Sequence, residues 1–196
     1  MRILLTNDDG VTAPGLRALY DALADYAEVS VVAPQTVQSG GAHAITIRHP
    51  LVCQQISVND RLRAISVEGT PADSVKLAIS SLMKEPPDIL VSGINHGSNT
   101  AINIIYSGTV SAATEGTVLG IPSIAVSLTT FGVPDFRFAA HFTRVLAAFI
   151  AKKGLPEGTL LNVNVPAVKK NEIRGVKMTR QGKTKWGDTF EVRRDP

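Results

Sequence analysis

The stretch RILLTNDDG (residues 2–10) brings a short apolar run directly against two adjacent carboxylates and a glycine. Its apolar part, residues 2–6, predicts a buried strand that stops at a turn. A helix is predicted next, over residues 14–26, because Pro14 suits a first helical turn and apolar side chains recur at helical spacing. A strand, a turn and a helix in this order are typical of the start of a parallel sheet covered by helices.

The remaining chain continues this alternation. Strands are predicted at residues 28–34, 88–94, 121–128 and 159–166, and helices at 70–83, 109–120 and 137–151. The segments around residues 44–47 and within 57–69 predict extra strands or a hairpin. We therefore expect an α/β fold: a Rossmann-like three-layer sandwich with a mainly parallel central sheet, helices on both faces and a small β-hairpin extension.

Charge is divided unevenly along the chain. Residues 1–168 contain 11 Lys and Arg against 13 Asp and Glu, whereas residues 169–196 contain 9 against 4. The net charge of +3 therefore comes from a basic C-terminal segment rather than from a basic groove. A basic tail can attract nucleic acid, but Trp186 and Phe190 are its only aromatic rings, which disfavours nucleic acid as a partner.

Cysteine and hydropathy patterns bear on the cellular setting and on the class of metal. The single Cys53 cannot form an internal disulfide, which favours the cytoplasm. The chain shows neither an apolar run of membrane-spanning length nor a secretory signal, so we expect no membrane association. With one Cys and four His, a zinc site of soft ligands is disfavoured, and a bound metal is expected to have oxygen ligands.

The acidic pair Asp8 and Asp9 has two interpretations. Asn, Asp and Gly are common in turns, so the pair could simply form one. However, ligands of parallel sheets bind outside the carboxyl ends of strands, where this pair lies, and two close carboxylates resist joint ionisation unless a cation is present. Ser39 and Asn95 follow other predicted strands and could add the neutral oxygens that Mg²⁺ accepts, although each could equally be an ordinary loop residue.

Residues 105–109 open a predicted helix, whose N-terminal N–H groups attract anions such as phosphate. Simple N-capping by Ser107 or Thr109 explains the same pattern. His43 and His96 lie in neighbouring loops, where an imidazole could assist proton transfer or serve only in packing. Glu115, further along the helix, is expected to contribute to capping and packing.

Five motifs, in order and with matching spacing, resemble the SurE survival-protein family. They are NDDG at 7–10, QSG at 38–40, GTPAD at 69–73, SGIN at 92–95 and YSGTVSAATEG at 106–116. The resemblance implies one catalytic domain over residues 1–182, followed at 183–196 by the start of a basic C-terminal extension that is short for the family. That family comprises metal-dependent nucleoside monophosphate phosphatases, so the resemblance implies a 5′-nucleotidase, with 3′-nucleotides and polyphosphate as further possible substrates.

The resemblance also implies particular site residues. The implied ligands of one divalent cation per subunit, Mg²⁺ or Mn²⁺, are Asp8, Asp9, Ser39 and Asn95, and the implied phosphate-binding residues are Asn99, Ser107, Gly108 and Thr109. Asp8 and Asp9 would also be the catalytic residues, with one of them orienting the attacking water. Family members associate through a C-terminal element, which implies a homodimer or tetramer where that element is present.

Other functions stay open at this point. A receiver-like signalling domain also places an acidic pair after its first strand, but it needs a phosphorylatable Asp where this chain has Asn95. A nucleotide-binding domain without catalysis is weakly supported, because the first turn lacks the G-x-G-x-x-G spacing and the chain contains no G-x-x-x-x-G-K-[ST] loop. A catalytically inactive member of the family is the third alternative.

After Asn99 the chain continues Thr-Ala-Ile-Asn instead of the family's Leu-Gly and acidic residues, which leaves the contacts beyond the phosphate undefined.

Overall fold

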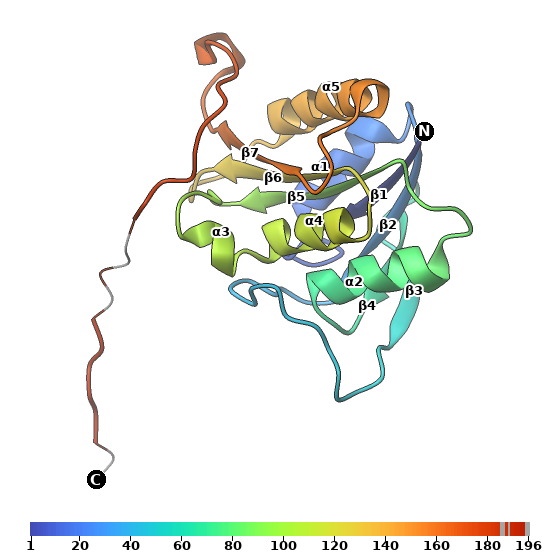
Figure 1. Cartoon of the computed structure of the whole chain (residues 1–196), viewed down its shortest axis with the longest axis horizontal. Coiled ribbons are helices and arrows are strands. Elements are labelled where there is room, and N and C mark those ends of the chain that lie inside the picture. The colour runs from blue at the N-terminus through green and yellow to red at the C-terminus, as the bar shows by residue number, and fades with distance from the viewer. Residues whose placement is uncertain (185–186, 188, 195–196) are drawn as a thin grey trace.

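A computed structural model describes residues 1–184, 187 and 189–194, and within them the chain forms one seven-stranded sheet with helices on both faces (Figure 1). The strand order is β3-β4-β2-β1-β5-β6-β7, and all neighbours are parallel except β3 and β4. The strands are β1 (Arg2–Thr6), β2 (Glu28–Pro34), β3 (Cys53–Ser57), β4 (Arg63–Val67), β5 (Ile89–His96), β6 (Ser123–Thr129) and β7 (Leu160–Pro166). The helices are α1 (Pro14–Leu23), α2 (Pro71–Leu77), α3 (Asn103–Tyr106), α4 (Gly108–Val118) and α5 (Arg137–Lys153), with a π-helical turn at Ala78–Leu82 and a 3₁₀ turn at Lys170–Glu172.

Strand β1 lies in the middle of the sheet, between β2 and β5. Its residues Ile3, Leu4 and Leu5 are fully buried, as expected for a parallel strand that is covered on both faces. One apolar core lies between the sheet and helices α1 and α5, and a second lies between the sheet and helices α2 and α4. The predicted three-layer α/β architecture is confirmed.

The predicted middle segment is only partly correct. The hairpin exists, formed by β3 and β4, but residues 44–47 do not form a strand. Their backbone groups are already used elsewhere: Thr46 N–H donates to the Asp73 carboxylate, and the Ala44 carbonyl accepts from the Thr70 hydroxyl. Local alternation of apolar residues was therefore overridden by contacts with helix α2.

Three helices end earlier than predicted, and the smallest difference is in α4, which stops at Val118 instead of residue 120. Helix α1 stops at Leu23 instead of residue 26, and the backbone N–H groups of Tyr26 and Ala27 turn back to the Leu23 carbonyl before β2 begins. Helix α2 stops at Leu77 and continues as the π-helical turn, in which Met83 N–H donates to the Ala78 carbonyl.

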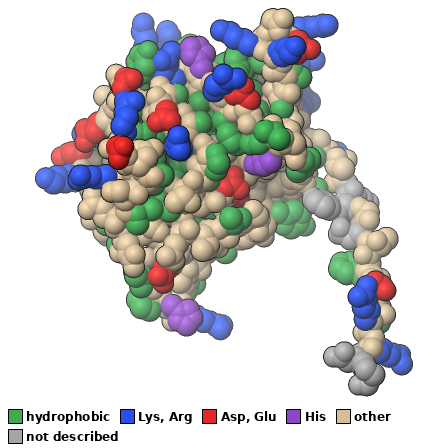
Figure 2. Space-filling model, turned by 180° about the vertical axis from the view of Figure 1, so that it is seen from behind, with side chains coloured by type: hydrophobic (Ala, Val, Ile, Leu, Met, Phe, Trp, Pro, Cys, Tyr) green, Lys and Arg blue, Asp and Glu red, His purple; other side chains and the backbone are tan. Residues whose placement is uncertain are grey.

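After β7 the described chain forms the 3₁₀ turn and then runs away from the sheet (Figure 1). Gln181 is attached to the domain through its side-chain amide, which donates to the Ala101 carbonyl at 3.0 Å. Of the predicted extension 183–196, Trp186 and residues 185, 188, 195 and 196 lie outside the described residues, and the boundary at 182 stays a prediction. Charged side chains of both signs are scattered over the face shown in Figure 2. Among the described helices, none combines the length and apolar character needed to span a bilayer.

Candidate metal and phosphate site

The acidic pair lies in a fixed turn at the carboxyl end of β1. The Asn7 side-chain amide donates to the Gly10 carbonyl at 2.9 Å, and Val11 N–H donates to the Pro34 carbonyl at the end of β2. Gly10 has a φ of +96°, which a side chain would disfavour. The predicted turn therefore exists, and it presents Asp8 and Asp9 at the carboxyl ends of the strands. In such folds ligands bind along this carboxyl edge of the sheet.

Asp8 is 3% exposed and points at the N-terminus of helix α4. The Thr109 hydroxyl donates to its carboxylate at 2.5 Å, and the backbone N–H groups of Gly108 and Thr109 also donate to it. A Cβ at Gly108 would lie 2.7 Å from the Asp8 Cβ, so this close approach needs a glycine. Burial raises the pKa of Asp8, and these hydrogen bonds oppose the rise.

Asp9 is partly buried beside it. Burial raises the pKa of Asp9 to about 6, the charge of Asp8 adds to the rise, and a hydrogen bond from the His96 backbone N–H opposes it. Ionising both carboxylates together is therefore costly in the protein alone. A divalent cation between them would remove that cost, which is the electrostatic environment expected of a metal site.

Asn95 lies on the adjacent strand β5, just after an irregularity. The pairing of β5 with β6 shifts register between Ser92 and Asn95, and a Cβ at Gly93 would lie 2.4 Å from the Val126 carbonyl oxygen. The Asn95 amide nitrogen donates to the Gly97 carbonyl at 2.8 Å. Because this contact uses the amide nitrogen, the Asn95 Oδ1 is the atom left to serve as a metal ligand.

Ser39 is exposed, in the loop of residues 35–52 between β2 and β3. The preceding residue, Gln38, donates its backbone N–H to the Asp8 carbonyl at 2.7 Å, and Ala42 N–H donates to the Tyr106 carbonyl at 3.2 Å. The loop therefore passes beside both the acidic pair and the segment before α4. The structure thus gathers the elements that carry the four implied metal ligands at one edge of the sheet.

Asn99 is buried in a network that sequence analysis missed. Its side-chain amide donates to the Ser127 hydroxyl at 2.8 Å, and its backbone N–H donates to Asn164 Oδ1 at 2.9 Å. The side-chain amides of Asn162 and Asn164 both donate to the Asn99 carbonyl. The sequence NVN in β7 could have indicated this network, because its two asparagines are two residues apart and therefore share one face of the strand.

The N-terminus of helix α4 is already occupied by the Asp8 carboxyl group. The Ser107 hydroxyl oxygen accepts from Val110 N–H at 3.1 Å, so the N-capping interpretation is confirmed for Ser107. That contact uses Ser107 only as an acceptor, which leaves its own proton free to donate. The Thr109 hydroxyl, in contrast, already donates its proton to Asp8.

Both candidate histidines have structural partners. His43 Nε2 lies 2.8 Å from a Glu115 carboxylate oxygen, and His96 Nε2 lies 2.9 Å from the Gly132 carbonyl oxygen. Within residues 1–184, 187 and 189–194, no three His, Cys, Asp or Glu side chains cluster as a metal site. A metal at the acidic pair would therefore depend on neutral oxygens as well.

The fold and this edge together define an α/β protein with an oxygen-lined acidic centre at the carboxyl ends of its strands. The chain belongs to the SurE family, since the family model described as Survival protein SurE matches residues 3–188.

Individual relatives agree with this assignment. A protein named 5′-nucleotidase SurE from Syntrophobacter fumaroxidans is 52% identical over 196 residues, which is 100% of this chain and 78% of that protein. One with the same name from Syntrophus aciditrophicus is 49% identical and covers 100% of this chain and 74% of its own length. The crystal structure of the SurE protein from Aquifex aeolicus matches with a TM-score of 0.84 and 41% identity, over 93% of this chain and 73% of that chain.

Proposed function

We propose that this protein is a metal-dependent 5′-nucleotidase that hydrolyses nucleoside monophosphates by attack of water. Relatives about half identical over the full chain carry the name 5′-nucleotidase SurE, which favours a hydrolase over a receiver-like domain. The observation that carries the proposal is the acidic pair, since Asp8 and Asp9 both have raised pKa values at the carboxyl edge of the sheet. Such perturbed carboxylates are typical of functional sites.

The residues present fit a single hard cation, Mg²⁺ or Mn²⁺, per chain. Asp8 and Asp9 would supply two carboxylates, Asn95 its free amide oxygen and Ser39 its hydroxyl, an oxygen set that such cations accept. A cation bound there supplies Lewis-acid polarisation of a phosphoryl oxygen and a lowered pKa of bound water.

The chain's own residues would position the substrate and move the proton. Thr109 and the backbone before it fix the Asp8 carboxylate, which would orient the attacking water and accept its proton. The free proton of Ser107 and the second amide proton of Asn99 are the donors we assign to the phosphate oxygens. Gly108 has no side chain, which lets the Asp8 side chain lie directly against the start of helix α4.

A direct assay tests the proposal. Purified protein stripped of metal should release no phosphate from AMP, and added Mn²⁺ or Mg²⁺ should restore continuous release. Phosphate release unaffected by excess chelator would contradict the metal requirement, and stable labelling of the protein by a small phosphodonor would favour the receiver-like alternative. The same assay with 3′-nucleotides and polyphosphate defines the substrate range.

Assembly and location form a second part of the proposal. The family resemblance supports a homodimer or tetramer where the C-terminal element is present, and light scattering of the purified chain would measure its assembly. The free Cys53, which is exposed, supports a cytoplasmic location, and cell fractionation would test it.

A further inference from the structure

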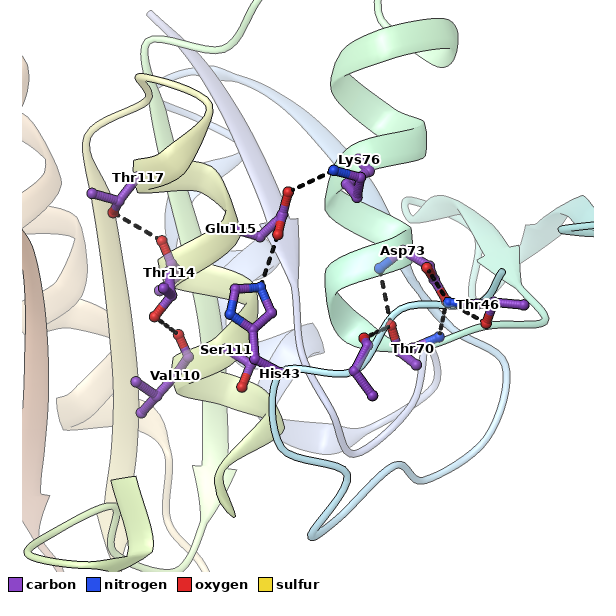
Figure 3. A network of polar contacts seen from close by, with 12 residues as sticks. His43, Thr46, Thr70, Asp73, Lys76, Val110, Ser111, Thr114, Glu115 and Thr117 are labelled. Carbon is purple, nitrogen blue, oxygen red and sulfur yellow. Dashed lines mark hydrogen bonds and ion pairs between the residues drawn. The ribbon is translucent and has the colours of Figure 1, made fainter. Parts of the chain in front are cut away.

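Two of the motifs have no role in the chemistry above: GTPAD at 69–73, and the glutamate of TEG, Glu115. In the structure both contact the same short segment, residues 43–46, which follows the loop that carries Ser39 (Figure 3). One motif approaches the segment from helix α2 and the other from helix α4. We call this arrangement of Asp73, Thr70 and Glu115 around residues 43–46 the loop clamp.

On the α2 side, Asp73 makes three kinds of contact. Its carboxylate accepts from the Thr46 backbone N–H at 2.9 Å, from the Thr46 hydroxyl at 2.6 Å and from the Thr70 backbone N–H at 2.9 Å. The Thr70 hydroxyl donates in turn to the Ala44 carbonyl at 2.8 Å. The capping box of α2 therefore does more than start a helix, because the same carboxylate and hydroxyl also hold the loop.

On the α4 side, the Glu115 side chain is only 7% exposed and holds two partners from different segments. One carboxylate oxygen lies 2.8 Å from His43 Nε2, and the other lies 3.0 Å from Lys76 Nζ. A buried carboxylate is costly unless both of its oxygens are paired. Without His43, one oxygen of the Glu115 carboxylate would lack this partner, and that favours the position of His43 beside helix α4.

Ser39 lies between this clamp and a second attachment. His43 follows it by four positions, and Gln38 immediately before it donates to the Asp8 carbonyl at 2.7 Å. The residues between turn sharply, with positive φ values of 74° at Gly40 and 51° at Ala42. The exposed Ser39 is therefore fixed from both sides, although its own side chain packs against little.

We propose that Asp73 and Glu115 are positioning residues whose clamp on residues 43–46 holds Ser39 at the metal site. The inference rests on the proposed function, in which Ser39 is a metal ligand. A free loop would have to be ordered each time a cation binds, whereas a clamped loop is ordered beforehand, so the clamp raises metal affinity. Residues that only orient metal ligands commonly change metal affinity by about 10- to 100-fold.

The test uses direct Mn²⁺ titration by calorimetry on the purified full chain, so that its result does not depend on turnover. His43→Ala removes the α4 contact, and Thr46→Val removes one contact on the α2 side while keeping the side-chain shape. Each variant should bind Mn²⁺ about tenfold more weakly. Its thermal midpoint should fall because a carboxylate loses a partner, but circular dichroism should show a folded protein at the titration temperature. His43→Gln, which can still donate to Glu115, should restore most of the affinity.

A matched control is His49→Ala, because His49 is an exposed histidine of the same loop and makes no side-chain hydrogen bond within the described part of the chain. It should bind Mn²⁺ like the wild type. Arg48 gives a second readout, since trypsin should cleave after it faster in His43→Ala than in the wild type, whose cleaved bond has the same two residues. Unchanged Mn²⁺ affinity and unchanged cleavage in both clamp variants would overturn the clamp, whereas absent phosphate release by metal-loaded wild type would overturn only the proposed function.

Discussion

The two halves of the proposed metal site are built in different ways. Asp8 is 3% exposed and is held between β1 and α4 by contacts that reach through the interior of the fold. Ser39 is exposed on a loop and depends on neighbouring residues of that loop for its position. The charged ligand that is hardest to bury is thus fixed inside the fold, and the neutral ligand is supplied by a surface loop that is attached on both sides of it.

This difference has an energetic reason. A buried carboxylate needs its hydrogen bonds in place before a cation arrives, and regular elements hold such donors more rigidly than loops. A hydroxyl needs no compensation for charge, so an exposed loop can carry it at small cost. Substitutions that disturb Asp8 should therefore abolish most of the activity, whereas substitutions in the Ser39 loop should only weaken metal binding.

The largest effect is expected from Asp8→Asn. The amide keeps the size of the side chain but removes the charge and the proton acceptor, so AMP hydrolysis should fall by about a thousandfold or more. The circular-dichroism spectrum and the chromatographic profile should stay like those of the wild type. AMP hydrolysis at the wild-type rate by this variant would show that Asp8 is not needed for catalysis.

A smaller but still large effect is expected from Gly108→Ala. The added methyl would lie 2.7 Å from the Asp8 Cβ, so Asp8 must shift, and activity should fall by about a hundredfold even in molecules that are folded. The stability cost should be about 1–3 kcal/mol, as in other overpacked sites, measured by urea unfolding.

Gly116→Ala is the matched control on the same helix. Its methyl would lie 2.6 Å from Ser123 Oγ and 2.8 Å from Leu90 Cδ1, away from the acidic pair. We expect a loss of stability with normal activity per folded molecule. Equal loss of activity in both glycine variants would mean that helix α4 acts on the site as a whole and not through Asp8.

The smallest effect concerns pH and Asp9. Its pKa is raised to about 6 in the folded protein from 3.8, so between these values the folded state binds more protons than the unfolded state. In the presence of chelator, the stability that Asp9 contributes is therefore fully present below about pH 4 and is lost as the pH rises to about 6.

Thermal unfolding at pH 4.5 and 7 would measure this dependence. Asp9→Asn should make the metal-free protein more stable at pH 7 by a few degrees, with less gain at pH 4.5. Added Mn²⁺ should stabilise the wild type at pH 7 more than this variant. A gain that is equal at both pH values would show that Asp9 ionisation is not the cause.

The sheet and the acidic pair could be predicted because their signals are local. Apolar runs marked the strands, helical spacing marked the helices, and the position of Asp8 and Asp9 directly after the first strand indicated a site. The strand predicted around residues 44–47 was wrong for the same reason. Its pattern was local, whereas the contacts with Thr70 and Asp73 that prevent a strand there are not.

Contacts between distant residues could not be predicted in this way. Thr109 reaches Asp8 across 101 positions, and Asn164 reaches Asn99 across 65 positions, so both depend on which strands become neighbours and in what register. His43 and Glu115 are 72 positions apart. The sequence therefore predicted which residues lie at the carboxyl edge, but not the side chains that orient them.

Calorimetric titration of Mn²⁺ into the metal-free wild type, Asp8→Asn and Ser39→Ala tests the two-part site most directly. We predict one bound Mn²⁺ per chain in the wild type, no measurable binding in Asp8→Asn, and binding about tenfold weaker but still one per chain in Ser39→Ala. Binding of Mn²⁺ to Asp8→Asn with wild-type affinity and stoichiometry would contradict a metal centre built on the acidic pair.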